Sequence, residues 1–468
     1  MRRMRSVVVA GMVASVLAAC AGTPVQRGST EAAFVVLGEG GRAIVRVVTR
    51  DPSCPPLDVD GAALPMNIRA VPETLPPRTA RGDAAKEKPS AFPVLVCERT
   101  LPFAAARASV GGRALAIPQR EPRRIVVLGD TGCVIGTSSS TIQNCNDPNA
   151  WPLAQIAAAA AAKRPDLVIH LGDYVYRENA CPAGNAKCAD SPWGYGWDVW
   201  DADFFTAARP LLAAAPWVFV RGNHESCGRA GQGWWRLLDP RLLLAGRDCN
   251  DAINDVTGDY SEPYVVPLSS DTQLIVFDSS RARVNALRPN DPMFVTYSAQ
   301  MKEVVELAKS AQHNFFINHQ PILGFATDPT RNPPGVYPGN EPLQSVLRPI
   351  NGDALFPSSI DALFAGHDHV FEMISFATPQ PTQFISGTGG GWLDDPLPQP
   401  LPPGAMVAPG AVIDKMVSNP AFGFLTIERA SGEHAAWRVQ AWDVFGRLFT
   451  TCLLRDRKAN CTRPPGPG

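Results

Sequence analysis

Short apolar runs that end in glycine and polar residues recur through the middle of the chain. Five of them are RIVVLGD (124–130), DLVIHLGD (166–173), PWVFVRGNHE (216–225), NFFINHQP (314–321) and ALFAGHDH (362–369). Runs of this length, bounded in this way, are typical of buried strands. Their alternation with helical segments predicts an α/β fold in which the C-terminal ends of the strands converge on one site.

Two segments between these strands carry helical patterns. Residues 151–165 (WPLAQIAAAAAAKRP) have Pro152 in the expected first turn, an alanine-rich body and Pro165 beyond the end, which are usual helix boundaries. A second helix is expected over residues 299–311 (AQMKEVVELAKSA).

The flanking regions have the pattern of β-structure. AFVVL (33–37), the turn GEGG and RAIVRVVTR (42–50) predict a hairpin, and further strands are expected near FPVLVC and RALAI. No cluster of chemistry-bearing residues falls in this part, so residues 33–120 are interpreted as a small N-terminal β-rich domain. From Gln383 onward QFISG, GFLTIE, AAWRVQAWDV and LFTTCLL follow one another closely, which favours a second, more antiparallel sheet.

The N-terminus has the pattern of an export signal. Three arginines precede an apolar run of about a dozen residues, too short to span a bilayer, and the run ends in LAAC (17–20). This ending resembles the lipobox of bacterial lipoproteins, which implies that residues 1–19 are removed and that Cys20 carries lipid, with residues 20–32 as a tether. Since Ala21 is not aspartate, the outer membrane is the expected destination. The alternative is an ordinary secretory signal in which Cys20 is incidental.

Charge and cysteine content bear on partners and compartment. Without the three arginines of the signal the net charge moves from −1 to −4, and no basic run remains, which argues against a nucleic-acid-binding surface. Besides Cys20 there are ten cysteines, an even number that indicates disulfides in an oxidising compartment, the periplasm or cell surface. Sequential pairing would close mostly short loops, as between Cys181 and Cys188. A disulfide between Cys133 and Cys145 is preferred over a thiolate ligand role, but the sequence leaves the connectivity open.

The residues at the strand ends form a candidate metal-binding set. They are Asp130, Asp173, Tyr176, Asn223, His224, His319, His367 and His369, and four of the seven histidines of the chain are among them. Carboxylate, imidazole, amide and phenol donors suit hard or borderline metal ions. The glycines that precede them let the backbone turn sharply off each strand, so that the side chain faces a cleft.

Over residues 123–443 the sequence resembles the metallophosphoesterase superfamily and, within it, the purple acid phosphatases. Most members of the superfamily have a histidine two residues after the first aspartate, where this chain has Gly132. In purple acid phosphatases a tyrosine in a Gly-Asp-x-x-Tyr motif supplies the missing ligand, and Tyr176 stands in that place here. The two departures compensate each other, so the resemblance implies that Tyr176 is a phenolate ligand of ferric iron.

The resemblance also implies roles for the other residues. Asp130, Tyr176 and His369 would hold the ferric ion, Asn223, His319 and His367 would hold a divalent Fe, Zn or Mn ion, and Asp173 would bridge the two. Such a metal pair activates water and stabilises charge during in-line displacement at phosphorus. His224 would protonate or hydrogen-bond the leaving-group oxygen, and Glu225 would orient His224. The family's second substrate-facing histidine has no clear counterpart, because His313 lies in the approach to a strand.

Other residues near these motifs are interpreted as structural. His170 is expected in the core, and Tyr174 is expected to pack, because the family spacing selects Tyr176. The segment SGTGGGW (386–392) lacks the lysine of a P-loop and is expected to form a tight turn near the site. The tryptophans in residues 191–205 either line a substrate entrance or pack a long loop.

Together these features predict an α/β protein with a metallophosphoesterase-like four-layer α/β/β/α sandwich over residues 121–458. The β domain at 33–120 would precede it, and a proline-rich tail at 459–468 would follow. The expected activity is hydrolysis of phosphomonoesters of small molecules, as in acid phosphatases. A phosphodiesterase or phospholipase-type activity is the alternative among hydrolases, because the same metal pair serves both. An alternative of another class is a non-catalytic envelope lipoprotein, which would be marked by a lost ligand, and all seven are present.

Overall fold

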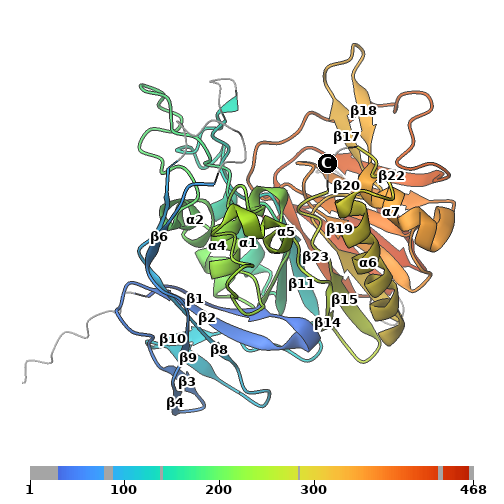
Figure 1. The fold of residues 1–468 in the computed structure, drawn as a ribbon. Coiled ribbons are helices and arrows are strands. Elements are labelled where there is room, and N and C mark those ends of the chain that lie inside the picture. The colour runs from blue at the N-terminus through green and yellow to red at the C-terminus, as the bar shows by residue number, and fades with distance from the viewer. Residues whose placement is uncertain (1–29, 79–87, 137–140, 283–284, 431–435, 463–468) are drawn as a thin grey trace, which may run out of the picture.

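Two β-sheets pack face to face at the centre of the molecule, and helices cover the outer face of each (Figure 1). The computed structural model describes residues 30–78, 88–136, 141–282, 285–430 and 436–462. Between the sheets, Val127 and Ile169 of the first sheet share one apolar cluster with Phe315 and Phe364 of the second. This arrangement confirms the predicted α/β/β/α sandwich.

The first sheet is mixed and has its parallel strands in the middle. In order across the sheet its strands are β26 (Lys458–Thr462), β25 (Leu448–Arg455), β24 (Ala436–Asp443), β23 (Gly423–Arg429), β11 (Arg124–Leu128), β12 (Leu167–His170), β13 (Trp217–Phe219), β1 (Thr30–Leu37), β2 (Ala43–Thr49), β8 (Leu95–Thr100) and β5 (Asn67–Ala70). Strands β11, β12 and β13 are parallel to one another. Their side chains are buried on both faces, as the continuous apolar runs predict.

The N-terminal region is β-rich, as predicted, but four of its strands belong to this central sheet. Strands β1 and β2 form the predicted hairpin, and β1 also pairs in parallel with β13, where Val36 lies opposite Trp217. Val35 and Val36 are both buried, which places β1 inside the sheet and not at an edge. The other strands form a small sheet and a hairpin: β10 (Arg113–Leu115), β9 (Ala108–Val110), β3 (Leu57–Val59) and β4 (Ala62–Leu64), and β6 (Glu73–Leu75) with β7 (Ser90–Phe92).

The second sheet carries the later strand-end motifs. Its strands, in order, are β14 (Tyr264–Pro267), β15 (Thr272–Val276), β16 (His313–Ile317), β19 (Ile360–Ala365), β21 (Thr382–Ser386), β20 (Phe371–Phe376) and β22 (Ile413–Asn419). The four from β15 to β21 are parallel neighbours. A separate hairpin of β17 (Phe325–Asp328) and β18 (Gly335–Pro338) extends from this half (Figure 1).

The C-terminal strands do not form a second sheet of their own, so that expectation is wrong. Strands β23 to β26 continue the first sheet, and β23 pairs antiparallel with β11, where Arg124 also forms an ion pair with Glu428. The predicted tail boundary after residue 458 falls inside β26, which is joined to β25 by the Cys452–Cys461 disulfide. Likewise β1 begins at Thr30, inside the predicted tether, while residues 1–29, including Cys20, lie outside the described part of the chain.

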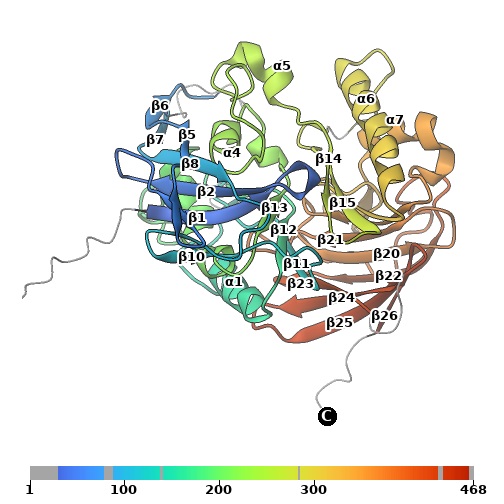
Figure 2. The ribbon, with the colours of Figure 1, turned by 90° about the horizontal axis from the view of Figure 1, so that it is seen from below.

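The helices lie on the two outer faces. On the first sheet they are α1 (Leu153–Ala162), α2 (Trp197–Trp200), α3 (Arg209–Leu212) and α4 (Gly231–Leu237), on the second α6 (Pro292–Leu307) and α7 (Glu341–Asn351), and a single turn, α5 (Asp255–Gly258), stands in a loop. Figure 2 shows α6 and α7, the second sheet and strands β23 to β25 as successive layers. The first predicted helix is confirmed, but α6 begins at Pro292, because Met293 and Tyr297 continue the buried face of Met301 and Val304. None of the helices in the described ranges is long and apolar enough to cross a membrane.

Five disulfides join all the cysteines other than Cys20. The pairs are Cys54–Cys97, Cys133–Cys145, Cys181–Cys188, Cys227–Cys249 and Cys452–Cys461. The pairing is sequential, and Cys133 is therefore not available as a thiolate ligand. The structure thus settles the connectivity that the sequence left open.

Candidate metal centre

Five of the candidate residues lie two to four residues beyond the C-terminal ends of neighbouring strands. Asp130, Asp173 and Asn223 follow β11, β12 and β13, while His319 and His367 follow β16 and β19. Because the strands within each group are parallel, their carboxyl ends meet at one edge of each sheet. Asp130, Asp173 and His367 have φ angles of 60°, 59° and 68°, in the left-handed region, so each turns the chain sharply where its strand ends.

The hydroxyl of Tyr176 lies at the centre of a first cluster. It is 3.0 Å from Oδ1 of Asp130, 2.9 Å from Oδ2 of Asp173 and 2.8 Å from Nε2 of His369. Nδ1 of His369 donates to the carbonyl oxygen of Trp392, which leaves Nε2 as an acceptor. A phenol has one hydrogen and can serve only one of these three acceptors, whereas a cation among the four atoms would suit them all.

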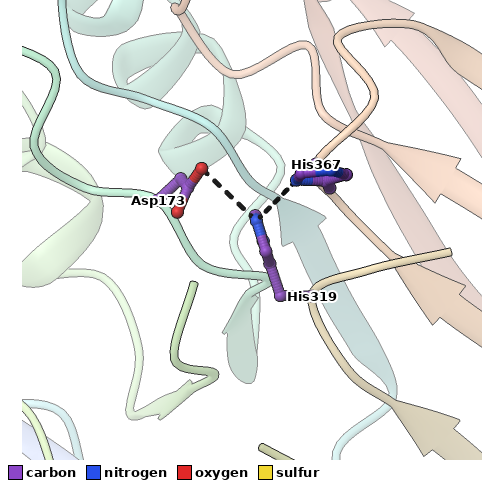
Figure 3. A group of neighbouring side chains, drawn as sticks. All are labelled: Asp173, His319 and His367. Carbon is purple, nitrogen blue, oxygen red and sulfur yellow. Dashed lines mark hydrogen bonds and ion pairs between the residues drawn. The ribbon is translucent and has the colours of Figure 1, made fainter. Parts of the chain in front are cut away.

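A second cluster forms around the amide oxygen of Asn223. This Oδ1 atom is 2.9 Å from Nε2 of His319 and 2.9 Å from Nδ1 of His367, and the two imidazole nitrogens are 3.3 Å apart. Nδ1 of His319 donates to the carbonyl oxygen of Leu171 at 2.8 Å, so its Nε2 faces the cluster. Figure 3 shows the rings of His319 and His367 directed toward one another beside Asp173.

Asp173 lies between the two clusters. Its Oδ2 atom is 2.9 Å from the Tyr176 hydroxyl and 3.3 Å from Nε2 of His319. The ligand atoms of Asp173, His319 and His367 all lie within 4.8 Å of one another, a spacing that could hold a metal ion. The structure therefore brings together all seven residues named from the sequence in the predicted two groups, and their binding of metal ions stays a prediction.

The electrostatics of this centre also fit a bound cation. Burial, together with the carboxylates of Asp130 and Asp173, raises the pKa of Tyr176 well above its usual value. Burial also raises the pKa of Asp130. A phenolate beside two buried carboxylates is therefore stable only if a strongly charged cation compensates them. The donors match hard and borderline metal ions, as the sequence indicated.

His224 lies at the side of this centre. Its Nδ1 atom is 3.1 Å from the carbonyl oxygen of Val175, to which it donates, and its Nε2 is 3.8 Å from Oδ2 of Asp173. Its ring centroid is 4.1 Å from that of Tyr176. Burial and the charge of Arg229 lower the pKa of His224 to about 4. The ring therefore has one nitrogen fixed by the backbone, and its other nitrogen lies between Asp173 and Nη2 of Arg229, which is 2.8 Å away.

The sequence predicts that Glu225 orients His224, and this prediction is wrong. The Glu225 side chain instead holds the backbone around Asp173. Its carboxylate accepts the N–H groups of Asp173 at 3.0 Å, Tyr174 at 2.9 Å and Gly222 at 3.1 Å. A buried carboxylate with several backbone donors connects two strand-end turns firmly. Glu225 thus positions Asp173 through the backbone of its turn.

The structural interpretations of neighbouring residues are confirmed. His170 is buried, with Nε2 3.0 Å from the Thr131 hydroxyl, and Tyr174 donates its hydroxyl to the carbonyl oxygen of Val220 at 3.0 Å. The 386–392 segment turns tightly beside the site, where Gly391 N–H donates to the carbonyl oxygen of Asp130 at 2.8 Å. Trp197 and Trp200, at 2% and 0% exposure, pack the long loop and do not line an entrance.

Sequence reasoning missed several charged residues that complete the site. Arg229 and Glu178 lie beside His224, and Asp394 accepts the backbone N–H of His369 at 2.7 Å. Asp203, which is fully buried, accepts the N–H groups of Cys133 and Tyr176 and so joins two of the ligand loops. Arg229, Glu178 and Asp394 are charged residues in loops, and Asp203 lies in a helical turn over Asp201–Phe205. In the sequence none of them differs from a charged residue on a solvated surface.

Comparisons with known proteins agree with this geometry. Residues 123–371 match the sequence model of the calcineurin-like phosphoesterase family. No curated protein matches the sequence significantly. A purple acid phosphatase, PPD1 from yellow lupin (Lupinus luteus) seeds, is similar in structure with a TM-score of 0.54 and 13% identity, over 92% of this chain and 74% of its own. PhoD is similar with a TM-score of 0.52 and 10% identity, over 95% of this chain and 94% of its own. At these identities the two structures support the fold alone.

Proposed function

Because the chain belongs to the calcineurin-like phosphoesterase family, we propose that it hydrolyses phosphomonoesters with a purple acid phosphatase-like centre. Family membership makes the chain a phosphoester hydrolase with a metal centre and a phosphorylated substrate. The proposal adds the kind of ester and the metals. Ferric iron would be held by Asp130, Tyr176 and His369, a divalent Fe, Zn or Mn ion by Asn223, His319 and His367, and Asp173 would be shared.

The observation that supports the proposal most directly is the position of the Tyr176 hydroxyl. It lies within 3.0 Å of a donor atom from each of Asp130, Asp173 and His369. A phenolate is a hard anionic ligand that suits ferric iron better than it suits soft metal ions. When bound, the two ions would supply Lewis acidity toward phosphoryl oxygens and a water of lowered pKa.

The protein's own residues would orient the ester and handle the proton of the leaving group. Nδ1 of His224 donates to the Val175 carbonyl oxygen, so Nε2, which lies 2.8 Å from Nη2 of Arg229, is the nitrogen that would turn to a substrate. A phosphate dianion beside it would favour the protonated imidazole, which can then donate to the leaving-group oxygen. Glu225 and Asp203 would keep the ligand loops in place during turnover.

The visible absorption spectrum of the purified, oxidised protein tests the iron–tyrosine assignment. We expect a broad purple band that is lost in Tyr176→Phe and kept in Tyr174→Phe, a matched control whose hydroxyl donates to a carbonyl oxygen in the core. A colourless wild-type protein with bound zinc or manganese would contradict the assignment. Steady-state assays with an aryl phosphomonoester and the corresponding diester then test the substrate class, and a faster diester reaction would favour the phosphodiesterase alternative.

We also propose that the protein is anchored by lipid at Cys20 in the periplasm or at the cell surface. The support is the lipobox-like sequence together with five disulfides that pair all the other cysteines. Incorporation of labelled palmitate by the expressed full chain, absent in Cys20→Ala, is the expected result. Labelling that is equal in both proteins would contradict the anchor.

A further inference from the structure

A partly buried arginine–carboxylate pair lies beside His224, outside the set of candidate ligands. Nε of Arg229 is 2.6 Å from Oε1 of Glu178, and Nη2 is 2.7 Å from Oε2 of the same carboxylate. The Tyr195 hydroxyl donates to Oε1 of Glu178 at 3.0 Å. The side chains of Arg229 and Glu178 are 14% and 5% exposed. Two parallel hydrogen bonds from one guanidinium hold that group in a single orientation.

The same guanidinium also contacts His224 and the backbone of Asn223. Nη2 of Arg229 is 2.8 Å from Nε2 and 2.5 Å from Nδ1 of His224, so the group lies against the imidazole ring. Nη1 is 3.5 Å from the backbone carbonyl oxygen of Asn223, itself a candidate ligand. Within the described ranges this long contact is the one hydrogen bond formed by Nη1. At least one N–H of Nη1 is thus available to an oxygen atom that enters beside His224.

We propose that Arg229, held by Glu178, binds an oxygen of the substrate's phosphoryl group and makes the site selective for phosphomonoester dianions over phosphodiester monoanions. The inference rests on the proposed function, because it assigns a recognition role within that site. A monoester near neutral pH carries nearly one negative charge more than a diester. A fixed cation in a partly desolvated site therefore stabilises a bound monoester more than a bound diester.

The test uses the full chain loaded with metal, at pH 7, with an aryl phosphomonoester and a bis-aryl phosphodiester. In Arg229→Gln we expect kcat/KM for the monoester to fall about 10- to 100-fold, the effect of losing one charge-assisted hydrogen bond, and that for the diester to stay within about threefold. Arg229→Lys should retain part of the monoester rate. Glu178→Gln, which loosens the guanidinium and keeps its charge, should raise KM for the monoester more than it lowers kcat.

Arg236→Gln is the matched control. Arg236, in α4, is buried and pairs with Glu73 at 2.5 Å, and its other side-chain hydrogen bond within the described ranges goes to the carbonyl oxygen of Val71, away from the centre. Arg236→Gln should leave the ratio of kcat/KM for the monoester to kcat/KM for the diester unchanged. An equal loss for both esters in Arg229→Gln, or no loss, would overturn the proposal. Loss of bound metal in Arg229→Gln would also overturn it, since the arginine would then support the centre and not the substrate.

Binding of inorganic phosphate separates this inference from the proposed function. If the wild-type protein hydrolyses neither ester, the proposed function fails, but calorimetric titration with phosphate still measures the role of Arg229. Phosphate binding that is about 10-fold or more weaker in Arg229→Gln than in the wild type and in Arg236→Gln supports the inference. Equal phosphate affinity in all three proteins refutes it.

Discussion

Gly132 lies against the ring of Tyr176, and no side chain would fit between them. A Cβ atom at Gly132 would be 2.8 Å from Cδ2 of Tyr176 and 2.7 Å from the carbonyl oxygen of Tyr174. These distances are well inside normal van der Waals contact. The residue that replaces the histidine of most relatives is therefore also the residue that makes room for the phenol. The absence of a side chain at Gly132 and the presence of Tyr176 are therefore connected by packing.

Substitution of this glycine should disturb the tyrosine without removing its hydroxyl. In Gly132→Ala the extra methyl group must displace the Tyr176 ring or its backbone, at a cost of about 1–3 kcal/mol in the free energy of unfolding. We expect a weakened or shifted visible band, a lower iron content and a lower Tm. A spectrum and a Tm equal to those of the wild type would show that the loop accommodates the methyl group, contrary to this account.

The two halves of the centre should be separable by mutation. Asn223→Ala removes the oxygen that lies 2.9 Å from both His319 and His367 but leaves the Tyr176 cluster intact. We expect the bound metal to fall from two ions per chain to about one, with the purple band retained and phosphatase activity lost. Elemental analysis beside the absorption spectrum measures both. If Asn223→Ala loses the band while it keeps two ions, the assignment of residues to the two ions is wrong.

Asp203 should be essential to the stability of the ligand loops. It pairs with Arg177 at 2.6 Å and accepts the N–H of Tyr176 at 2.9 Å, and it has no exposed surface. In Asp203→Ala the buried Arg177 loses its partner, which should lower the free energy of unfolding by about 3–5 kcal/mol. Chemical denaturation measures the difference.

The control for Asp203→Ala is a more exposed ion pair that involves the preceding helix α2. Lys88 and Asp198 are 3.4 Å apart, with side chains 34% and 52% exposed. Asp198→Asn should change the free energy of unfolding by less than about 1 kcal/mol. Similar losses in Asp203→Ala and Asp198→Asn would contradict the special role of the buried pair.

Removal of metal should destabilise the folded protein. Without cations the buried carboxylates of Asp130 and Asp173 repel one another. Ions that bind the folded state alone stabilise it by mass action, by about 3–4 kcal/mol at roughly 100 to 1,000 times the Kd. Chelation should lower the Tm, and added iron with zinc should restore it. His319→Ala, which disrupts the second cluster, should respond less to the metals. A Tm that does not depend on metal in the wild type would argue against the site.

The strand-end motifs could be predicted because each is local. A glycine after an apolar run, followed by a ligand residue, is visible within about ten residues, and the fold class follows from the alternation of strands and helices. The pairing of distant strands is not local. Nothing within β1 or β23 alone identifies β13 or β11 as its neighbour, so the N-terminal strands were assigned to a separate domain and the C-terminal strands to the wrong sheet.

The charged residues that support the site could not be predicted from the sequence for the same reason. Arg229, Glu178 and Asp203 become meaningful only when loops about 25 to 50 residues apart come together. The role of Glu225 was misjudged because its neighbour in sequence, His224, is not its partner in space. Its partners are the backbone N–H groups of the Asp173 turn.

The place of β11 in the sheet has a consequence for the order of assembly. This strand leads into Asp130, yet one of its neighbours, β23, is supplied about 300 residues later, as the Arg124–Glu428 contact across 304 positions shows. During synthesis β11 therefore has an unpaired edge until β23 has emerged, and such long-range pairing is slow. Chaperone protection of the nascent chain is accordingly most needed before residue 423 appears. We therefore expect the metal centre, which includes Asp130, to be complete only after β23 has closed this edge of the sheet.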